Sequence, residues 1–593
     1  MIVFINCYEE MATGMRMLAA MAGEKGFAVH MLVLHGYTVI STDVLDEKAS
    51  SMHVCVNGAF HVNSVKARPF SSEELLSLQQ KLRELRPELI CVSTRSANDA
   101  SMPAMLAAIR EVCPDVPIAC GGYGPTYAPE HYLRHGADIV LRGEGEVSFA
   151  ALLDNLRRGT PLHDAPNACY LENDSQVCTP LAAPLRDISD LPSPLTGDGV
   201  TSFIHDSQLE ERDPAFDDKT FYILAGRGCI GACTYCAAPV LNGYYAAEGH
   251  VLPKYRRRRY EQVLQELEQA RAHGVRRIFF KDEYLVDEPG RLIDFLRRYR
   301  ERVNLPFRAN LHSEQLLRHP NLLDAALDAG MYGYSIGFQA GTEEMARTVY
   351  GRPHGFTDFM TLAKKLFEQF VSLQYHFVSG TSLNTDEEFQ AKCRLIASLP
   401  YDPSAPWRAL CMDFQFFPQP LSALSQQLGH GGLRRLPVRD WAFAALRAQL
   451  RHFAHEDEIG QAEEEALRAA DGIAFLQRRS GQLRRKRARE YYQELGQKLA
   501  EHHVLIMGEA TPAYAAHSHI LTDSHIAGRI AFPGYTATMG RIDAHDVATE
   551  VDPETPIILF GESFYRFARQ MRRQYRLQNP IYGVTKYDFA GAE

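Results

Sequence analysis

The sequence predicts an α/β protein, in which a doubly wound domain is followed by a partial (β/α)6 barrel, a helical segment and a small C-terminal α/β domain. Two series of short apolar runs alternate with helical periodicity, and such strand–helix repeats form parallel sheets covered by helices. A chain of 593 residues is also too long for one hydrophobic core. The predicted divisions are 1–158 for the doubly wound domain, 159–218 for a linker, 219–420 for the barrel, 421–500 for the helical segment and 501–593 for the last domain.

The first series lies in residues 1–158. Its apolar runs are MIVFIN, AVHMLVL, ELICVST, VPIACGG and ADIVLRG, with helical patterns between them. In a doubly wound sheet, the ligand crevice lies at the carboxyl ends of the strands. The Pro-, Asp- and Ser-rich stretch that follows, LRDISDLPSPLTGDG, predicts an ordered linker crossing a surface.

The second series predicts the barrel. Six apolar runs, FYILAG, VRRIFFKDE, PFRANLH, YGYSIGFQ, LQYHFVSG and ALCMDFQFF, are separated by helical patterns. Residues 421–500 have helical periodicity and are expected to cap the barrel and select the substrate. Their aromatic residues have spacings that favour helix packing over a binding pocket; they are Trp441, Phe443, Phe453 and Phe475. The last segment resembles nucleotide-binding units but has only Gly508 in its first turn, so we expect an interaction or regulatory role.

Composition limits the possible partners. Hydrophobic residues make up 46% and charged residues 23% of the chain, and the net charge is −10, which is typical of a globular protein and does not call for nucleic acid. No apolar run is long enough for a membrane helix, and MIVFINCYEE is interpreted as a strand, not a signal peptide. We therefore expect a cytoplasmic protein. Nine scattered cysteines are interpreted as small buried hydrophobes, not as a disulfide framework: Cys7, Cys55, Cys91, Cys113, Cys120, Cys169, Cys178, Cys393 and Cys411.

Three further cysteines, Cys229, Cys233 and Cys236, lie within the stretch RGCIGACTYC. A structural zinc site needs a fourth ligand, and neither a cysteine nor a histidine follows before His250. A Cys-x-x-Cys redox pair leaves Cys229 unexplained. Three thiolates suit a 4Fe-4S cluster with one open iron. A zinc site completed from a distant residue remains an alternative.

The Cys-x-x-x-Cys-x-x-Cys spacing, with Tyr235 before the last cysteine, resembles the radical S-adenosylmethionine (SAM) superfamily. The resemblance implies that SAM chelates the open iron and that electron transfer into its sulfonium releases a 5'-deoxyadenosyl radical. Asp282 and Glu283 occupy the place of an acidic motif that receives the SAM amino group in that family. Gln339 stands where the family has a glutamate that contacts the SAM ribose, and an amide still bonds hydroxyls without charge. Tyr235 is also assigned to the SAM site.

Two glycine-rich stretches, CGGYGPTYAPE and GADIVLRGEGEVSFAALL, lie in the first domain. Consecutive glycines at a strand end let a bulky ligand approach the backbone, although such loops also serve as plain packed turns. With the barrel they resemble the cobalamin-binding domain that precedes many radical SAM barrels. The resemblance implies that cobalamin lies between the two domains, against these residues: Ser93, Thr94, Gly121, Gly122, Tyr123, Gly143 and Glu144.

The loop NCYEEMATG, residues 6–14, lacks the Asp-x-His-x-x-Gly pattern that supplies a cobalt-ligating histidine in one cobalamin family. No histidine ligand from such a motif is expected, and the lower face of cobalt is open or bound by water. This loop is expected to lie under the corrin ring. No single catalytic residue follows from the sequence.

The resemblance implies a cobalamin-dependent radical SAM enzyme, with methyl transfer to an unactivated carbon of a small molecule as the favoured reaction. Cyclisation or rearrangement without net methylation is one alternative, and a non-catalytic cobalamin or redox sensor, permitted by Gln339, is another. A low-potential electron donor of the flavodoxin or ferredoxin type is an expected partner. A macromolecule-modifying enzyme would need a docking surface, and the basic segment 478–489 is the candidate, although a solvated helix face is the favoured interpretation.

Overall fold

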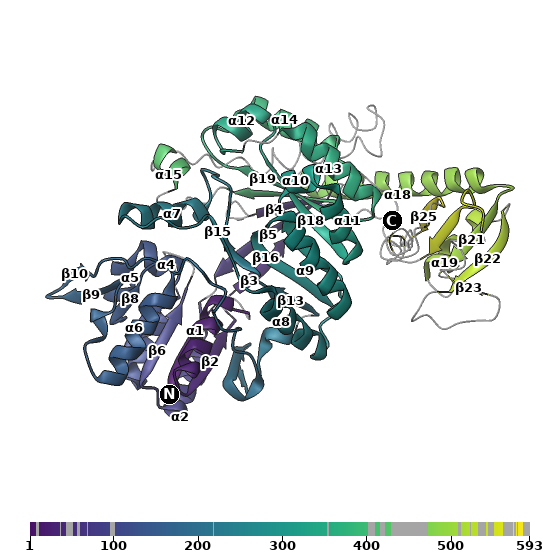
Figure 1. Cartoon of the computed structure of the whole chain (residues 1–593). Helices are drawn as coiled ribbons and strands as arrows, with labels where there is room; N and C mark the ends of the chain where they lie inside the picture. Colours follow the sequence, from purple (N-terminus) through teal and green to yellow (C-terminus); the bar gives the residue numbers. More distant parts are fainter. Residues whose placement is uncertain are drawn as a thin grey trace.

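The computed structural model describes residues 1–7, 11–35, 37–42, 51–55, 60–67, 69–94, 101–217, 219–352, 355–400, 409–415, 422–428, 472–507, 512–521, 524–531, 541–543, 551–560, 568, 573, 577 and 579–584. Three large sheets organise these residues, two of nine strands and one of five. Figure 1 shows the N-terminal unit beside the barrel and the C-terminal unit on the far side of the barrel. The α/β class is confirmed.

The N-terminal sheet has a parallel centre in the order β2-β1-β6-β7-β8. This is the doubly wound order, in which strand order reverses beside the first strand. Helices α1 and α6 pack on one face of the sheet, and α2, α3 and α5 on the other. The elements are β1 (Ile2–Asn6), α1 (Thr13–Glu24), β2 (Val29–Leu34), α2 (Ser72–Leu85), β6 (Leu89–Ser93), α3 (Met102–Val112), β7 (Ile118–Gly121), α4 (Tyr123–Tyr127), α5 (Pro129–Arg134), β8 (Ile139–Leu141) and α6 (Gly145–Arg158).

The segment 159–218 differs from the expected surface linker, because it supplies strands to both edges of this sheet. β9 pairs antiparallel with β8 and with β10, while β11 pairs parallel with β2 and antiparallel with β12. Cys169 and Cys178 form a disulfide between β9 and β10, so the interpretation of these two cysteines as free buried hydrophobes was wrong. The strands are β9 (Ala168–Glu172), β10 (Ser175–Cys178), β11 (Thr201–His205) and β12 (Gln208–Glu210).

The second sheet contains the six parallel strands expected for a partial barrel, in the order β13-β16-β17-β18-β19-β20. The strands are β13 (Thr220–Ile223), β16 (Arg277–Leu285), β17 (Phe307–Leu311), β18 (Met331–Gln339), β19 (Ser372–Ser379) and β20 (Ala409–Gln415). The helices between them are α7 (Ala237–Ala247), α8 (Tyr260–Ala272), α9 (Pro289–Arg302), α10 (Ser313–Arg318), α11 (Pro320–Asp328), α12 (Glu343–Thr348), α13 (Phe356–Glu368) and α14 (Asp386–Ala397). A short ribbon of β14 (Gly226–Gly228) and β15 (Tyr255–Arg257) lies beside them.

Three strands of the N-terminal part of the chain extend the barrel sheet. β4 pairs antiparallel with β20, β5 pairs with β4, and β3 pairs with β5. In Figure 1 these strands lie among the barrel strands and not in the N-terminal sheet. They are β3 (Tyr37–Thr42), β4 (Ser51–Cys55) and β5 (Phe60–Ala67). The barrel sheet is therefore built from strands of the first domain as well as from strands of the barrel.

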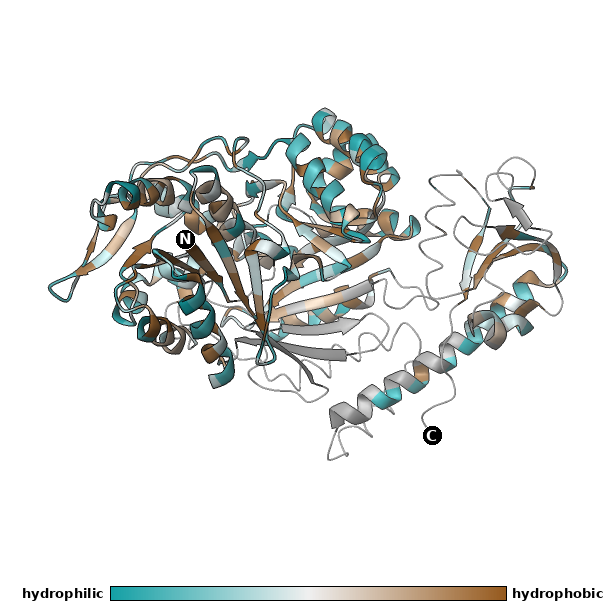
Figure 2. Cartoon of the chain, turned by 90° about the horizontal axis from the view of Figure 1, so that it is seen from below, coloured by the Kyte–Doolittle hydropathy of each residue, from teal (hydrophilic) through white to brown (hydrophobic). Residues whose placement is uncertain are grey.

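The C-terminal unit is a five-stranded parallel sheet in the order β23-β22-β21-β24-β25. It follows the long helix α18 (Gly472–Leu499), which carries the basic segment 478–489, and Figure 2 shows hydrophilic and hydrophobic residues along that helix. The strands are β21 (His503–Met507), β22 (His525–Ala531), β23 (Arg541–Asp543), β24 (Ile557–Phe560) and β25 (Ile581–Val584). Trp441, Phe443, Phe453 and Gly508 lie outside the described residues. Across the described ranges, no helix has the length and apolarity needed to cross a membrane.

Candidate cofactor site between the sheet and the barrel

A cavity of about 1090 Å³ lies between the N-terminal sheet and the first barrel strands. It is lined by the carboxyl ends of β1, β6, β7 and β8 on one side and by residues of β13, β14 and β16 on the other. The carboxyl ends of parallel strands are where open α/β sheets bind ligands. The volume is at the upper end of the range for small-molecule pockets, so the site suits a large cofactor.

The residues expected to contact cobalamin gather in this cavity. All of them line it: Ser93, Thr94, Gly121, Gly122, Tyr123, Gly143 and Glu144. Gly122 has a φ of +103°, and a Cβ there would lie 2.5 Å from the carbonyl oxygen of Thr94, so glycine is required for the close approach of the two strand ends. Asn6, Met11 and Gly14, at the ends of the loop after β1, line the cavity as well. The glycines bring the strand ends close together at this wall, which also carries apolar side chains such as Phe4 and Phe149.

Glu144 also joins the N-terminal unit to the barrel. Arg256 Nη1 donates to Glu144 Oε2 at 2.8 Å, and Arg227 donates to Glu144 at 3.2 Å and to Glu146 at 2.7 Å. The backbone amide of Glu144 donates to the Tyr245 hydroxyl at 2.7 Å. Burial raises the pKa of the Tyr245 hydroxyl to about 12, so this group stays neutral. The GEGE stretch therefore fixes the position of the cysteine-loop region as well as lining the cavity.

Gly143 is needed for that contact between units. Its φ is +74°, and a Cβ there would lie 2.2 Å from the Tyr245 hydroxyl at the end of α7. Its amide donates to Thr126 Oγ1 at 2.9 Å. The glycine that was assigned to cofactor binding from the sequence thus has a demonstrated packing reason, the approach of α7.

The three cysteines of the motif lie in one loop between β14 and α7. The amide of Gly231 donates to Cys229 Sγ at 3.3 Å, and a Cβ on Gly231 would lie 3.4 Å from Cys229 Sγ and 3.7 Å from Cys233 Sγ. The loop folds around its sulfur atoms, which fits a sulfur-ligated cluster that accepts amide hydrogen bonds. Among the described residues, no group of three or more His, Cys, Asp or Glu side chains is arranged to hold a single metal ion.

The cysteine loop adjoins the cavity. Residues just before it, Gly226 to Gly228, and residues just after it, Ala238, Leu241 and Asn242, line the cavity wall. Burial, and to a lesser extent the charges of Cys233, Cys236 and Glu283, raise the pKa of the Cys229 thiol to about 11. The three cysteines are not themselves among the lining residues, but the chain on both sides of their loop is.

The two residues of the acidic motif point in different directions. Asp282 is 1% exposed and accepts a hydrogen bond from the Ala225 amide at 3.0 Å, so it holds the loop after β13. Burial raises its pKa to about 7. Glu283 lines the cavity, and burial raises its pKa while the charge of Arg227 opposes the rise. Only Glu283 of this pair faces the cavity.

Gln339 and Tyr235 lie outside the cavity lining. Gln339 is 7% exposed with a φ of +67° at the end of β18. Tyr235 packs edge-on against Tyr350, with ring centroids 5.6 Å apart. Both border a residue that sequence reasoning missed, the buried Arg352, whose Nη1 lies 3.6 Å from Cys233 Sγ and whose Nη2 donates to the Gly337 carbonyl at 3.0 Å.

Arg352 gives the cysteine loop a buried positive charge. Its other neighbour is the Tyr284 hydroxyl, at 3.3 Å from Nη1. A cation beside thiolates stabilises their negative charge in a low-dielectric interior. The sequence offered only a weak signal for this role, an arginine in the turn after α12, because the pairing spans more than a hundred residues.

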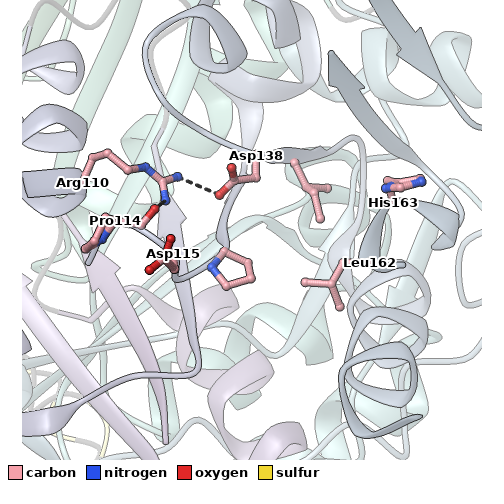
Figure 3. A pocket seen from close by; sticks show the side chains of 8 residues that line it. Arg110, Pro114, Asp115, Asp138, Leu162 and His163 are labelled. Carbon is pink, nitrogen blue, oxygen red and sulfur yellow. Dashed lines mark hydrogen bonds and ion pairs between the residues drawn. The ribbon is translucent and has the colours of Figure 1, made fainter. Parts of the chain in front are cut away.

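A second, smaller hollow of about 270 Å³ lies near the other end of the N-terminal sheet. Figure 3 shows Arg110 and Asp138 joined across it, with Arg110 Nη2 donating to Asp138 Oδ2 at 2.7 Å. Asp138 and Pro117 precede the strands β8 and β7, so this hollow is at the amino ends of the strands. That is the end opposite to the cofactor crevice of such folds.

Comparison with known families agrees with this geometry. A model described as B12 binding domain matches residues 59–153, and a model described as Radical SAM superfamily matches residues 223–396. The first match contains the ends of β6, β7 and β8 that line the cavity, and the second contains the cysteine loop and the strands from β16 to β19.

Two curated relatives have similar sequences. An uncharacterized methyltransferase of Pyrococcus horikoshii is 22% identical over 54% of this chain and 66% of its own length. An anaerobic magnesium-protoporphyrin IX monomethyl ester cyclase of Cereibacter sphaeroides is 21% identical over 54% of this chain and 50% of its own length. The chain thus spans less than two thirds of the length of either relative.

A solved structure shares the fold. The radical S-adenosylmethionine methyltransferase TsrM of Kitasatospora setae, solved with cobalamin and a [4Fe-4S] cluster bound, superposes with a TM-score of 0.52 at 15% identity, covering 83% of this chain and 99% of that one. Together with the geometry above, the two family matches show that the chain carries a B12-binding domain followed by a radical SAM domain.

Proposed function

We propose that this protein is a cobalamin-dependent radical SAM methyltransferase that acts on an unactivated carbon of a small molecule. The observation that carries the proposal is the single cavity of about 1090 Å³ lined both by the B12-binding strand ends and by residues flanking the cysteine loop. Two cofactors bound on its opposite sides would face one another. The methyltransferases among the similar proteins support the same reaction.

The cofactors supply the difficult chemistry, a 5'-deoxyadenosyl radical from cluster-bound SAM and a transferable methyl group from cobalamin. The residues of the chain bind, orient and shield them. Cys229, Cys233 and Cys236 would hold the cluster, and Arg352 would offset part of its negative charge through the contact at Cys233.

The other residues predicted from the sequence have different proposed roles, which depend on where each one lies. Glu283 faces the cavity and is the candidate to accept the SAM amino group. Asp282 is buried behind it and acts as a positioning residue. Gln339 is the candidate for the SAM ribose, and Tyr235 would pack beside the cluster. Ser93, Thr94, Gly121, Gly122 and Tyr123 would bind the cobalamin tail, while Gly143 and Glu144 would hold the two units together.

The proposal includes the partners expected from the sequence. A small-molecule substrate would enter the cavity, and a flavodoxin- or ferredoxin-type donor would reduce the cluster in the cytoplasm. The basic segment 478–489 lies on α18, where Arg478, Lys486 and Arg489 are exposed and Lys486 lies 3.9 Å from Glu490. This supports a solvated helix face over a docking site for nucleic acid.

Anaerobic turnover tests the proposal. The protein with reconstituted cluster and cobalamin would be incubated with SAM, a low-potential reductant and an extract of small metabolites, and the products followed by mass. We expect both S-adenosylhomocysteine and 5'-deoxyadenosine, with a metabolite heavier by one methylene group. Serine at positions 229, 233 and 236 together should abolish all three products, whereas Cys113→Ser, a buried cysteine in the other unit, should not.

Cyclisation or rearrangement is the second candidate, because one similar protein is an ester cyclase. It predicts 5'-deoxyadenosine without S-adenosylhomocysteine. Formation of neither product, with the cluster and cobalamin both present, would contradict both reactions and favour the sensor.

A further inference from the structure

The inside of the barrel carries two positive charges that the proposed cofactors leave unused. Along β16 and β17, Ile278, Phe280, Phe307 and Ala309 belong to the core under the outer helices. Because side chains alternate along a strand, the intervening residues face the barrel interior. Those residues are Phe279, Lys281, Arg308 and Asn310.

Arg308 is a buried cation that has no carboxylate partner within the described part of the chain. It is 8% exposed, its Nη2 donates to Ser335 Oγ at 2.9 Å, and its Nε has no hydrogen-bond partner. Among the residues that the structure describes, no carboxylate pairs with it. Burial lowers its pKa to about 10. An unpaired buried charge is costly, so a protein retains one where a ligand supplies the partner.

The surroundings of Arg308 are shaped to hold it in place. A Cβ on Gly333 of the next strand would lie 3.2 Å from Arg308 Cγ, so the glycine leaves room for the arginine stem. The guanidinium carbon lies 5.6 Å from the centre of the Phe279 ring. Asn310, two residues farther along the strand, has a buried Oδ1 with no hydrogen-bond partner. A ligand here would meet both a cation and a free amide acceptor.

Lys281 lies between the surroundings of Arg308 and the cavity. Its side chain lines the cavity, and its Nζ lies 5.6 Å from the centre of the same Phe279 ring and 5.1 Å from that of Tyr222. No ion pair involves Lys281 within the described part of the chain. The two cations therefore border one aromatic surface, Lys281 at the cavity and Arg308 deeper in the barrel.

We propose that Lys281 and Arg308 bind the carboxylate of the substrate, so that the protein acts on a small aromatic or otherwise flat carboxylic acid. The planar fork of arginine matches a carboxylate, lysine adds a point charge, and Phe279 and Tyr222 supply a flat apolar surface. This inference rests on the proposed function for the reaction that the bound acid undergoes. The binding experiment below does not depend on that reaction.

The backbone of Arg308 is remote from that of Glu283, the candidate to accept the SAM amino group. Arg308 is level with Phe279 in the sheet register, four residues before Glu283 at the cofactor end of β16. That separation is about 13 Å along the strand at about 3.3 Å per residue. We therefore assign the carboxylate that meets Arg308 to the substrate, and the SAM affinity of Arg308→Met tests this assignment.

Binding without turnover tests the inference. Protein with cluster, cobalamin and S-adenosylhomocysteine bound would be titrated calorimetrically with 3-phenylpropionate and with its neutral analogue 3-phenylpropionamide. We expect the wild type to bind the acid at least tenfold more tightly than the amide. Arg308→Met and Lys281→Met should each remove that preference, while Lys364→Met, which removes an exposed cation on α13, should leave it intact.

Several outcomes would overturn the inference. One is equal binding, or absence of binding, of acid and amide by the wild type. Another is a preference that survives in either variant. A third is a tenfold loss of SAM affinity in Arg308→Met, which would assign this arginine to the cofactor. Iron content and the cobalamin absorption spectrum establish that each variant is folded. If methyl transfer fails while the acid preference holds, only the proposed reaction is wrong.

Discussion

Arg256, in the middle of β15, donates from Nη1 to Glu144 Oε2 of the N-terminal unit at 2.8 Å. The two side chains are 5% and 6% exposed. This contact connects the barrel to the loop that begins α6, so the distance between the two halves of the cavity depends on a buried ion pair. Four predictions follow from this arrangement and its neighbours.

Glu144→Gln should destabilise the protein by about 3–5 kcal/mol, because it leaves the buried Arg256 without a countercharge. Chemical denaturation measures the loss, and the amount of cobalamin retained after gel filtration should fall with it. The matched control is Glu130→Gln, whose exposed pair with Arg134 on one helix contributes little. Equal losses of stability in the two variants would show that the buried ion pair stabilises the protein no more than the exposed pair does.

Gly122→Ala should abolish cobalamin retention. A Cβ at this position would lie 2.5 Å from the Thr94 carbonyl oxygen, and the φ of +103° is unfavourable for any other residue. The strand ends that form the cradle must then separate. Absorption spectroscopy of the purified protein measures bound cobalamin.

The control for this glycine is Gly23→Ala on α1, where a Cβ meets nothing within 4 Å. It should retain cobalamin and gain slightly in stability, since alanine favours a helix. Full retention of cobalamin by Gly122→Ala would mean that the cofactor does not approach this turn.

Arg352→Gln should leave the iron content unchanged and make the cluster harder to reduce. Removing a buried positive charge whose Nη1 lies 3.6 Å from Cys233 Sγ disfavours the more negative, reduced state. A negative shift of roughly 60 mV corresponds to a tenfold change for a one-electron couple. Spectroelectrochemistry measures the potential. Arg347→Gln, an exposed arginine on α12, should leave it unchanged, and an unaltered potential in Arg352→Gln would argue against electrostatic support of the cluster.

Asp282 should make stability fall as pH rises. Its pKa of about 7 exceeds the ordinary value of 3.8, so the folded protein keeps a proton that the unfolded chain has lost. The stabilisation is fully present below about pH 4 and is lost as pH rises through 7, a change of about 2–3 kcal/mol between pH 5 and pH 8. Glu283 and Tyr255 are the titratable groups that face it.

Denaturation of the wild type and of Asp282→Asn at the two pH values isolates this contribution. The difference in stability between the two proteins should change by that amount from pH 5 to pH 8, because asparagine does not titrate. Asp294→Asn, on the exposed face of α9, should show no such change. A constant difference would mean that Asp282 is already ionised at pH 5.

The sequence by itself determined the parts whose signals are local. Alternating apolar runs identified the strands of the doubly wound sheet and all six barrel strands, because a buried parallel strand is a short continuous apolar segment. The three cysteines also lie within one loop, and each pair of glycines lies within one loop, so these signals are local as well. They predicted the cofactor types, and the strand ends bearing Ser93 and Gly122 line the cavity as expected.

The tertiary structure decided whatever depends on residues far apart in the chain. β4 joins the barrel by pairing with β20, and β11 joins the first sheet beside β2, although both lie in segments with no strong local pattern. The sequence likewise assigned Asp282 and Glu283 one role, and the fold separated them. The contact between Glu144 and Arg256 forms only when distant strands come together. The same packing buries Arg308, which meets no carboxylate among the residues that the structure describes. Backbone periodicity is set by neighbours along the chain, whereas charge compensation is set by neighbours in space, and a single sequence records the first far more directly than the second.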